Sequence, residues 1–146
     1  MTKSAAETRL IALLSLLESG LAGTGAEVAR VNGLPARIPE AGIVLLRDGD
    51  PGVPEVTLSP LTYHYAHRAE VDILVDLPDA QRDAGFDALR LAIGAALAAD
   101  RTLGGLCDWI EAEAPAPLAI PVEGAETLKA ATITVVMHYD ASDPLG

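Results

Sequence analysis

One stretch of the sequence decides the fold: LTYHYAHRAEVDILVD, residues 61–76. Apolar side chains occupy alternate positions over residues 69–75, and Glu70, Asp72 and Asp76 lie on the opposite side of the alternation. This period of two is typical of a β-strand with one face buried and the other in water. The stretch therefore predicts a long strand, whose three carboxylates are expected to be solvated.

The same alternation recurs in residues 131–139 and predicts a second long strand, with a loose tail over 140–146. Leucines at helical spacing after the capping-box pair Ser4 and Glu7 predict a helix over 5–21. A second helix is expected over 80–99, capped by Asp79, with small residues that allow close approach to the sheet. Shorter strands are expected at 26–31, 43–47 and 106–111.

The order of these elements is helix, strands, helix, strands. That order predicts an α+β fold, in which two main helices pack on one face of an antiparallel β-sheet. With 146 residues and no linker or repeat, the whole chain 1–146 is expected to form a single domain.

Composition excludes several classes of function. The formal net charge is −11, and the ten Lys and Arg residues are scattered, which argues against sequence-specific binding of nucleic acid. The single cysteine cannot form an intramolecular disulfide, which favours a reducing, cytoplasmic compartment. No signal peptide and no membrane-spanning segment are expected, because the apolar runs are short or broken by charge.

Little in the sequence indicates catalysis. Cys107 could act as a nucleophile if a histidine lay close to it, but a buried free thiol is the commoner case. His64 and His67 are three apart on the predicted strand, so they face opposite sides, on a surface expected to be partly exposed. His138 could meet them across the sheet. We expect no catalytic residue, no cofactor and no metal, and a small enzyme using Cys107 or the histidines remains an alternative.

The best candidate for a binding surface is a loop rich in Gly and Pro between predicted strands. Such loops often carry function, although a plain mobile hairpin tip explains the composition equally well. Its two aspartates lack the spacing of a calcium loop. The only tryptophan, Trp109, fits an interface anchor or a core residue equally well. The loop consists of Asp48, Gly49, Asp50, Pro51, Gly52, Val53 and Pro54.

Several segments together resemble a known family. They are residues 43–47, HRAEVDILV at 67–75, FDALRLAI at 86–93, DRTLGGL at 100–106 and the final strand at 131–139. The chain resembles, over essentially its whole length, the tail-terminator (tail-completion) proteins of long-tailed phages, as found in gene transfer agents and related prophages. TLGGL at 102–106 is the most telling of these segments.

This resemblance implies a structural protein and no catalytic residues. It implies a homo-oligomer, a hexameric ring that caps the tail-tube protein, ends tube polymerisation and offers a docking surface to the head-side stopper or connector protein. DNA would pass through the lumen without specific binding, helped by the acidic charge. The protein would be cytoplasmic during assembly and then part of the particle. Another neck protein, or an enzyme of the acyl-transferase kind, is the alternative.

Overall fold

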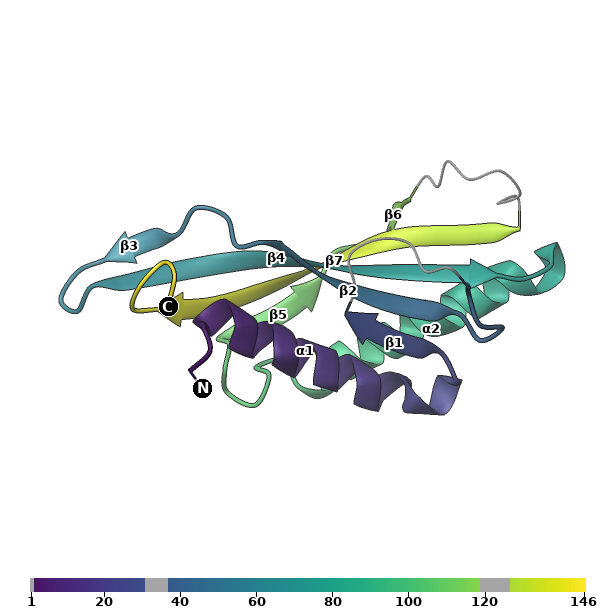
Figure 1. Cartoon of the computed structure of the whole chain (residues 1–146), viewed down its shortest axis with the longest axis horizontal. Coiled ribbons are helices and arrows are strands. Elements are labelled where there is room, and N and C mark those ends of the chain that lie inside the picture. Colours follow the sequence, from purple (N-terminus) through teal and green to yellow (C-terminus); the bar gives the residue numbers. More distant parts are fainter. Residues whose placement is uncertain (1, 31–36, 119–126) are drawn as a thin grey trace.

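The computed structural model describes residues 2–30, 37–118 and 127–146. Two helices and a seven-stranded sheet make up the described chain (Figure 1), which confirms the predicted α+β class. In chain order the elements are α1 (Ala5–Leu21), the 3₁₀ turn η1 (Ala22–Thr24), β1 (Glu27–Arg30), β2 (Ile43–Asp50), β3 (Glu55–Thr57), β4 (Thr62–Asp76), α2 (Asp79–Ala99), β5 (Trp109–Ala112), β6 (Ala116–Pro117) and β7 (Leu128–Ala141).

The two long strands β4 and β7 pair antiparallel at the centre of the sheet. The strand order is β1-β2-β4-β7-β5, while β3 also pairs with β4 and β6 with β7. Most strand pairs are antiparallel, as predicted, while β1 runs parallel to β2, so the sheet is mixed. A parallel pair needs a connection that returns the chain to the end where the first strand began.

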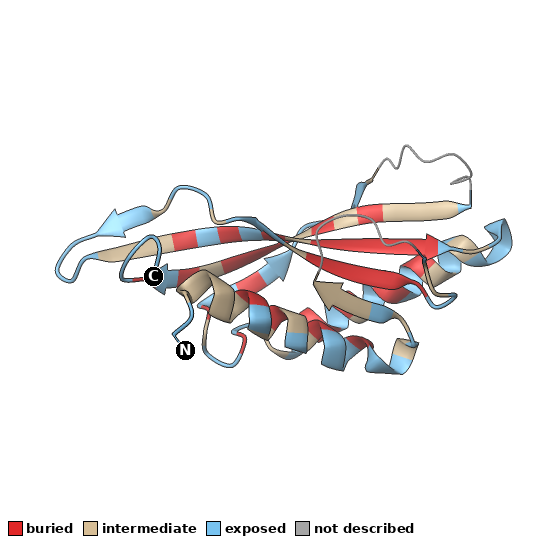
Figure 2. Cartoon of the chain, in the orientation of Figure 1, coloured by how far each residue is buried: buried red, intermediate tan, exposed pale blue. Residues whose placement is uncertain are grey.

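Both helices cover the same face of the sheet, as predicted (Figure 1), and the buried residues gather between them and the strands (Figure 2). From α1, four leucines at helical spacing enter this core. From α2, Phe86, Leu89, Ile93 and Leu97 do so. A smaller apolar cluster of Ile43, Leu45 and Leu74 lies on the opposite face. Neither described helix is long and apolar enough to cross a bilayer.

The starts of the helices differ in part from expectation. The Ser4 hydroxyl accepts a hydrogen bond from the Glu7 amide at 3.1 Å, but the Glu7 carboxylate binds Arg30, so only half of the capping box forms. Asp79 does not cap α2, because the capping position is occupied by Pro78. Asp79 lies in the first turn and forms an ion pair with Arg82 at 2.8 Å.

One small residue of α2 serves a different contact from the one predicted. Ala96 faces α1 and not the sheet, and a Cβ added to Gly20 would overlap the Ala96 side chain. Small side chains at this point let the two helix backbones approach closely, so that both helices fit side by side on one sheet face.

The strand boundaries also move. β2 continues through Asp48, Gly49 and Asp50, so the predicted loop shrinks to residues 51–54. A β-bulge makes this continuation possible, since two residues of β2 oppose one of β4 between the pairs Arg47–Glu70 and Asp50–Arg68. β5 begins at Trp109, after turns and bends over 100–108. The tail is not loose, because the Gly146 carbonyl accepts a hydrogen bond from the Ala5 amide at 3.0 Å.

Gly49 at the bulge has φ +68°, and a Cβ there would overlap the backbone carbonyl of Arg68. We expect Gly49→Ala to lower the free energy of unfolding by more than the about 1–2 kcal/mol that the left-handed backbone costs a non-glycine residue. Gly52→Ala is the matched control, because Gly52 has φ +72° but open space around a new Cβ. The difference between the variants in chemical denaturation should be about 1–3 kcal/mol. Equal losses would contradict the close approach at Gly49.

Candidate functional site

A hairpin projects from the covered part of the sheet. We call residues 51–61 the arm: it consists of the loop 51–54, β3 and the turn into β4. β3 pairs with the first residues of β4, from Glu55 opposite His64 to Thr57 opposite Thr62. Figure 1 shows the arm extending beyond the N-terminal end of α1, so neither helix covers it. The predicted loop therefore divides between the end of β2 and the base of the arm.

Asp48 fastens the end of β2 to the rest of the molecule. Its carboxylate pairs with the Arg30 guanidinium at 2.8 Å, and the same guanidinium binds Glu7 of α1 at 2.7 Å. The two carboxylates raise the pKa of Arg30, and Arg30 in turn lowers the pKa of Glu7. Asp48 thus supports the base of the arm, a structural role that the loop prediction did not include.

His67 is buried beneath the same point, on the core face of β4, with 1% of its surface exposed. Its Nε2 lies 2.6 Å from the Asp48 carbonyl, which can only accept, so Nε2 carries the hydrogen. In the neutral ring Nδ1 then accepts from the Tyr139 hydroxyl at 2.8 Å. The expectation of a partly exposed His67 was wrong. The imidazole is buried because both nitrogens find partners, the condition that a buried polar group requires.

On the opposite, open face of the sheet lies a hollow of about 390 Å³, lined by residues of the base of the arm, of β4 and of β7. Val53 of the predicted loop lines it, together with His64, His138 and Asp140. Trp109 stacks flat on His138, with ring centroids 5.1 Å apart, and remains 42% exposed. The structure therefore brings one predicted loop residue and the stacking partner of Trp109 to the same hollow, and places Trp109 on the surface.

His64 links three strands at this hollow. Its Nε2 lies 2.7 Å from the Thr57 hydroxyl and its Nδ1 lies 2.6 Å from Asp140. Hydroxyl, imidazole and carboxylate are the groups of a nucleophile triad. However, 38% of the His64 side chain and 46% of the Asp140 side chain are exposed, whereas catalysis of this kind relies on donors preorganised where water is excluded. The contacts instead tie the arm to β4 and β7.

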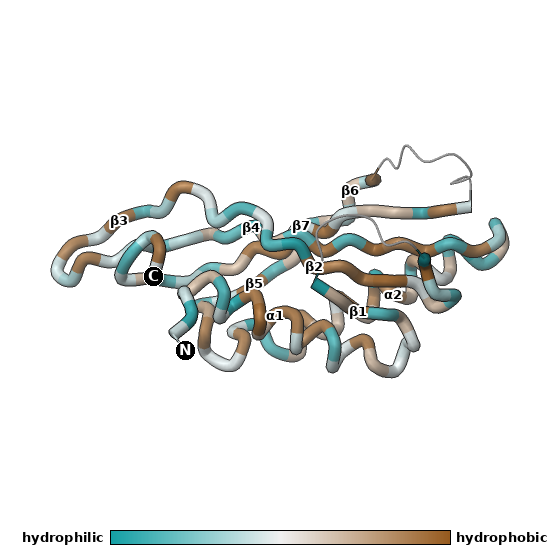
Figure 3. The backbone as a smooth tube through the Cα atoms, viewed as in Figure 1, coloured by the Kyte–Doolittle hydropathy of each residue, from teal (hydrophilic) through white to brown (hydrophobic). Residues whose placement is uncertain are grey.

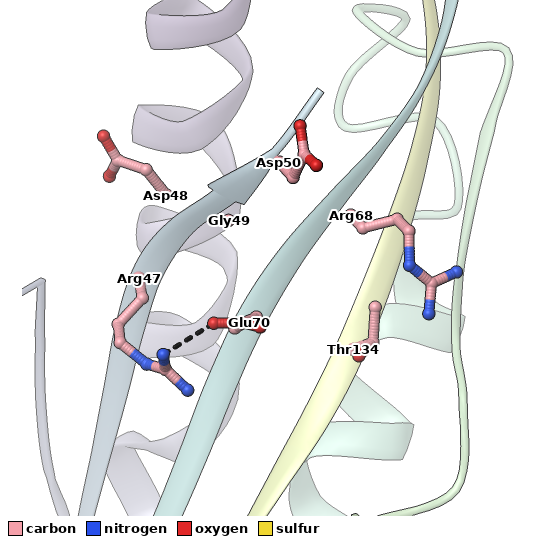
Figure 4. A pocket seen from close by; sticks show the side chains of 7 residues that line it. All are labelled: Arg47, Asp48, Gly49, Asp50, Arg68, Glu70 and Thr134. Atoms are coloured by element: carbon pink, nitrogen blue, oxygen red, sulfur yellow. Dashed lines mark ion pairs between the residues drawn. The ribbon is translucent and has the colours of Figure 1, made fainter. Parts of the chain in front are cut away.

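A second hollow of about 610 Å³ opens on the same face where the bulge redirects β2 (Figure 4). Arg47 and Arg68 line it, and both are paired: Arg47 with Glu70 at 2.6 Å and with Asp72, Arg68 with Glu113 at 2.7 Å. In Figure 4 the Arg47 guanidinium points toward Glu70, while Arg68 points away from it. Both arginines of this hollow are thus paired with carboxylates of the same chain.

Asp72 was expected to be solvated, and the structure corrects this. Only 6% of its surface is exposed. Its carboxylate accepts two hydrogen bonds from Arg47, at 2.8 and 2.9 Å, and one from the Thr132 hydroxyl at 2.6 Å. Both partners come from neighbouring strands, so the burial follows from strand pairing and not from local sequence.

Cys107 is buried, and burial raises the pKa of its thiol to about 11. The thiol therefore stays protonated near neutral pH, whereas the nucleophilic form is the thiolate. Cys107 belongs to the turns before β5, where its amide donates to the Thr102 carbonyl at 2.9 Å. Over residues 2–30, 37–118 and 127–146, no group of three or more His, Cys, Asp or Glu side chains is arranged to hold a metal ion.

No protein-family model matches the sequence, and a search of curated proteins finds no match. Several chains of solved structures match, and one of them aligns over 90% of this chain and 92% of its own length, with a TM-score of 0.51 and 13% identity. That structure is described as the virion of a native gene transfer agent particle. The two chains share a fold. At this identity the likeness concerns the fold alone.

Sequence reasoning missed the features that shape the surface. Val56, Leu58 and Leu61 of the arm are all exposed, and the alternation of apolar residues does not reveal this. The partners of Asp72 and His67 come from other strands, so no local pattern could reveal them. A usable signal was present at Gly49, because glycine inside an otherwise regular strand often marks a bulge.

The burial of His67 should make folding sensitive to pH. Burial lowers the pKa of His67 below 6.5, its ordinary value, despite the Asp48 carbonyl, which acts in the opposite direction. As the pH falls below 6.5, the unfolded chain takes up the proton first, so the free energy of unfolding should fall, by up to about 1.4 kcal/mol per pH unit, until the folded pKa is reached. Well above pH 6.5 the imidazole is neutral in both the folded and the unfolded chain, so its contribution is constant.

Denaturation of the wild type and His67→Gln between pH 7.5 and about pH 5 measures this effect, since the variant keeps an amide donor and acceptor but cannot titrate. The carboxylates are common to both proteins, so the difference between the two pH profiles isolates His67. Parallel profiles would contradict the assignment.

Cys107 should react slowly in the native protein. With its thiol buried and its pKa near 11, we expect a thiol reagent at pH 8 to label the folded chain far more slowly than the chain unfolded in denaturant. Cys107→Ala should keep the fold and lose all labelling. Rapid stoichiometric labelling of the folded protein would contradict this and would revive Cys107 as a candidate nucleophile.

Proposed function

We propose that this protein is a structural component of a phage-like particle and acts as its tail terminator, a ring of six copies that caps the tail tube, ends tube growth and joins the tail to the head side. The observation that carries the proposal is the shared fold with a chain of a gene transfer agent virion, over nine-tenths of both chains. The segments that resemble tail terminators, above all residues 102–106, support the specific role.

The surface of the molecule suits a subunit of an assembly. Four of the eight large apolar side chains exposed in the described chain lie on the arm, where no other element covers them. β3 pairs with β4 alone among the described strands, which leaves its outer edge available. In a closed ring both the exposed apolar side chains and the free edge of β3 can be covered, because each copy contacts its neighbour.

The open-face hollow is the surface we assign to an external partner, the tube protein or the head-side connector. Val53 of the loop 51–54 lines it, and Trp109 lies beside it, stacked on His138. A half-exposed tryptophan on a rigid strand is a frequent anchor of protein interfaces. Deleting part of this loop should weaken binding of the external partner and leave the fold intact. The deletion must be confined to residues 51–54, because Gly49 and Asp50 belong to β2.

Passage of DNA fits the charge of the chain. The formal net charge of −11 gives an assembled ring a strongly negative total, which disfavours binding to the phosphates of duplex DNA. The protein would assemble in the cytoplasm and remain in the neck of the particle. An enzymatic role is disfavoured by the protonated, buried thiol of Cys107.

Light scattering on the purified protein, alone and with its tail-tube protein, tests the proposal. We expect a mass of six times the 15.1 kDa chain, either free or only on the ends of tubes, and tubes that stop growing when the protein is added. The ring should not bind duplex DNA at physiological salt.

Outcomes of this test separate the alternatives. A protein that ignores tube ends but binds the head-side connector would be a different neck component, such as a stopper. A stable monomer that ignores both partners would overturn the structural role. Tight binding of duplex DNA by the ring would leave the ring in place but contradict the non-adhesive lumen.

A further inference from the structure

Helix α2 carries apolar residues on the side that faces away from the sheet. Its buried side chains, among them Leu89 and Ile93, face the core. On the opposite side, exposed residues at helical spacing form a stripe without a charged or polar side chain. A surface helix normally carries polar residues on that side, and a helix that is apolar all round is normally covered. We call the exposed residues the outer stripe: Ala84, Ala88, Leu91, Ala95 and Ala98.

Leu91 is the large side chain of the outer stripe, and it is 65% exposed. Ala88 precedes it by one helical turn and Ala95 follows it by one turn, so the leucine projects from a low surface. The outer stripe therefore offers one apolar knob, and the small residues on either side of the knob allow a partner to approach closely.

A second uncovered apolar surface lies at the arm, on the sheet face that the helices cover elsewhere. Val56 lies opposite Tyr63 in the β3–β4 pairing, and Tyr63 shares its face of β4 with the buried Tyr65. Val56 is 50% exposed, and Leu61 at the turn is 48% exposed. Figure 3 shows hydrophobic positions continuing along the arm, outside the helix-covered part of the sheet. We call this surface the uncovered face.

A hollow of about 210 Å³ lies where the uncovered face meets the start of α1. The rings of Tyr65 and Tyr139 line it, with centroids 5.8 Å apart. Pro51 and Leu145 also line it, and none of its described lining residues has a charged side chain. An apolar cavity of about 150 Å³ can hold a benzene molecule, so this hollow has room for the four carbon atoms of a leucine side chain.

We infer that the outer stripe of α2 of one copy packs on the uncovered face of a second copy of this chain, with Leu91 inserted into the hollow beside Tyr65 and Tyr139. An apolar helix side and an apolar sheet face each need another element to cover them. The two surfaces cannot meet within one subunit, because the outer stripe faces away from the sheet and α2 lies toward the other end of the molecule (Figure 1).

The dimensions of the two surfaces agree. From Tyr65 to Leu61 the uncovered face is about 14 Å long at about 3.4 Å per residue, and the stripe from Ala88 to Ala98 is about 15 Å long at about 1.5 Å per residue. One surface has large side chains around a hollow, and the other has one large side chain among alanines. Since neither surface contains a charged side chain, their contact would leave no charge buried without a partner.

Such a contact fits the proposed ring, on which the inference rests. A contact between unlike surfaces of identical chains is heterologous, and it generates a ring when the rotation closes. It also leaves the open face of the sheet free. Glu55 and His64 project from the other side of the arm, toward the open-face hollow assigned above to the tube or connector.

Disulfide trapping tests the inference, in a Cys107→Ala background. Leu91→Cys places a thiol on the outer stripe and Leu145→Cys places one at the hollow, where Leu145 is 90% exposed, each as a separate protein. Under mild oxidation on tube protein we expect a linked pair of chains when the two proteins are mixed, and none when either is oxidised alone. Ile11→Cys is the control for Leu91→Cys: Ile11 is exposed on α1 outside both surfaces, and its mixture with Leu145→Cys should not link.

The outcomes separate the inference from the proposed function. Rings that persist by light scattering while the mixture fails to link would overturn the inference and leave the ring in place. Self-linked dimers of Leu91→Cys would also overturn it, because they require α2 against α2, and so would equal linking by Ile11→Cys. Absence of assembly by the wild type on tube ends would remove the proposed function, and the inference with it.

A pair of surface substitutions provides a second measurement. Leu91→Asp should raise the protein concentration needed for assembly on tube ends at least tenfold, because a charge replaces the apolar side chain that enters the hollow. Gln81→Asp is the matched control, since it adds the same charge at an exposed position in the first turn of α2, outside the outer stripe. Both variants should unfold at the midpoint of the wild type. Equal effects on assembly, or no effect of Leu91→Asp, would contradict the assignment.

Discussion

β4 and β7 pair without interruption from Tyr63 opposite Ala141 to Asp76 opposite Leu128. This ladder spans about 45 Å at about 3.4 Å per residue, whereas α1, at about 1.5 Å per residue, covers about 25 Å. A slip of one residue would turn the core side chains of one strand outward relative to its partner, so the ladder fixes which residues can be buried. Because it is so much longer than α1, part of it extends beyond the helical layer, and the arm is built on that extension.

The junction between the covered sheet and the extension is held by polar groups. Asp72 and His67 are buried there, and both form hydrogen bonds with the end of β2. Asp72 accepts from the Arg47 guanidinium, and His67 donates to the Asp48 carbonyl. Arg30 connects the same strand end to α1. Buried polar groups with all their partners present tolerate little rearrangement. The arm therefore leaves the body of the protein in a defined direction.

The elements governed by local pattern were predictable from sequence. Period-two alternation located β4 and β7, and leucine spacing located α1 with its correct ends. The features set by contacts between distant residues were not predictable: the parallel direction of β1, the contact of Ala96 with α1, and the burial of Asp72 by Arg47 and Thr132. For the candidate surface, the role of the loop and of Trp109 stays a prediction, and the structure shows only that Val53 lines the open-face hollow and that Trp109 is exposed beside it. The apolar side of the arm was missed, since alternation alone cannot tell a strand covered by helices from one that extends past them.

Two strands share one edge of β4. β2 ends its pairing with Asp50 opposite Arg68, and β3 begins with Glu55 opposite His64. Residues inserted at the turn between β3 and β4 would therefore lengthen the hairpin while the register of the body stayed as it is. Each added pair would extend it by about 3.4 Å, and insertion on both strands together would keep every side chain on its present face. The reach of the hairpin can thus change in small steps over evolution without any change to the core.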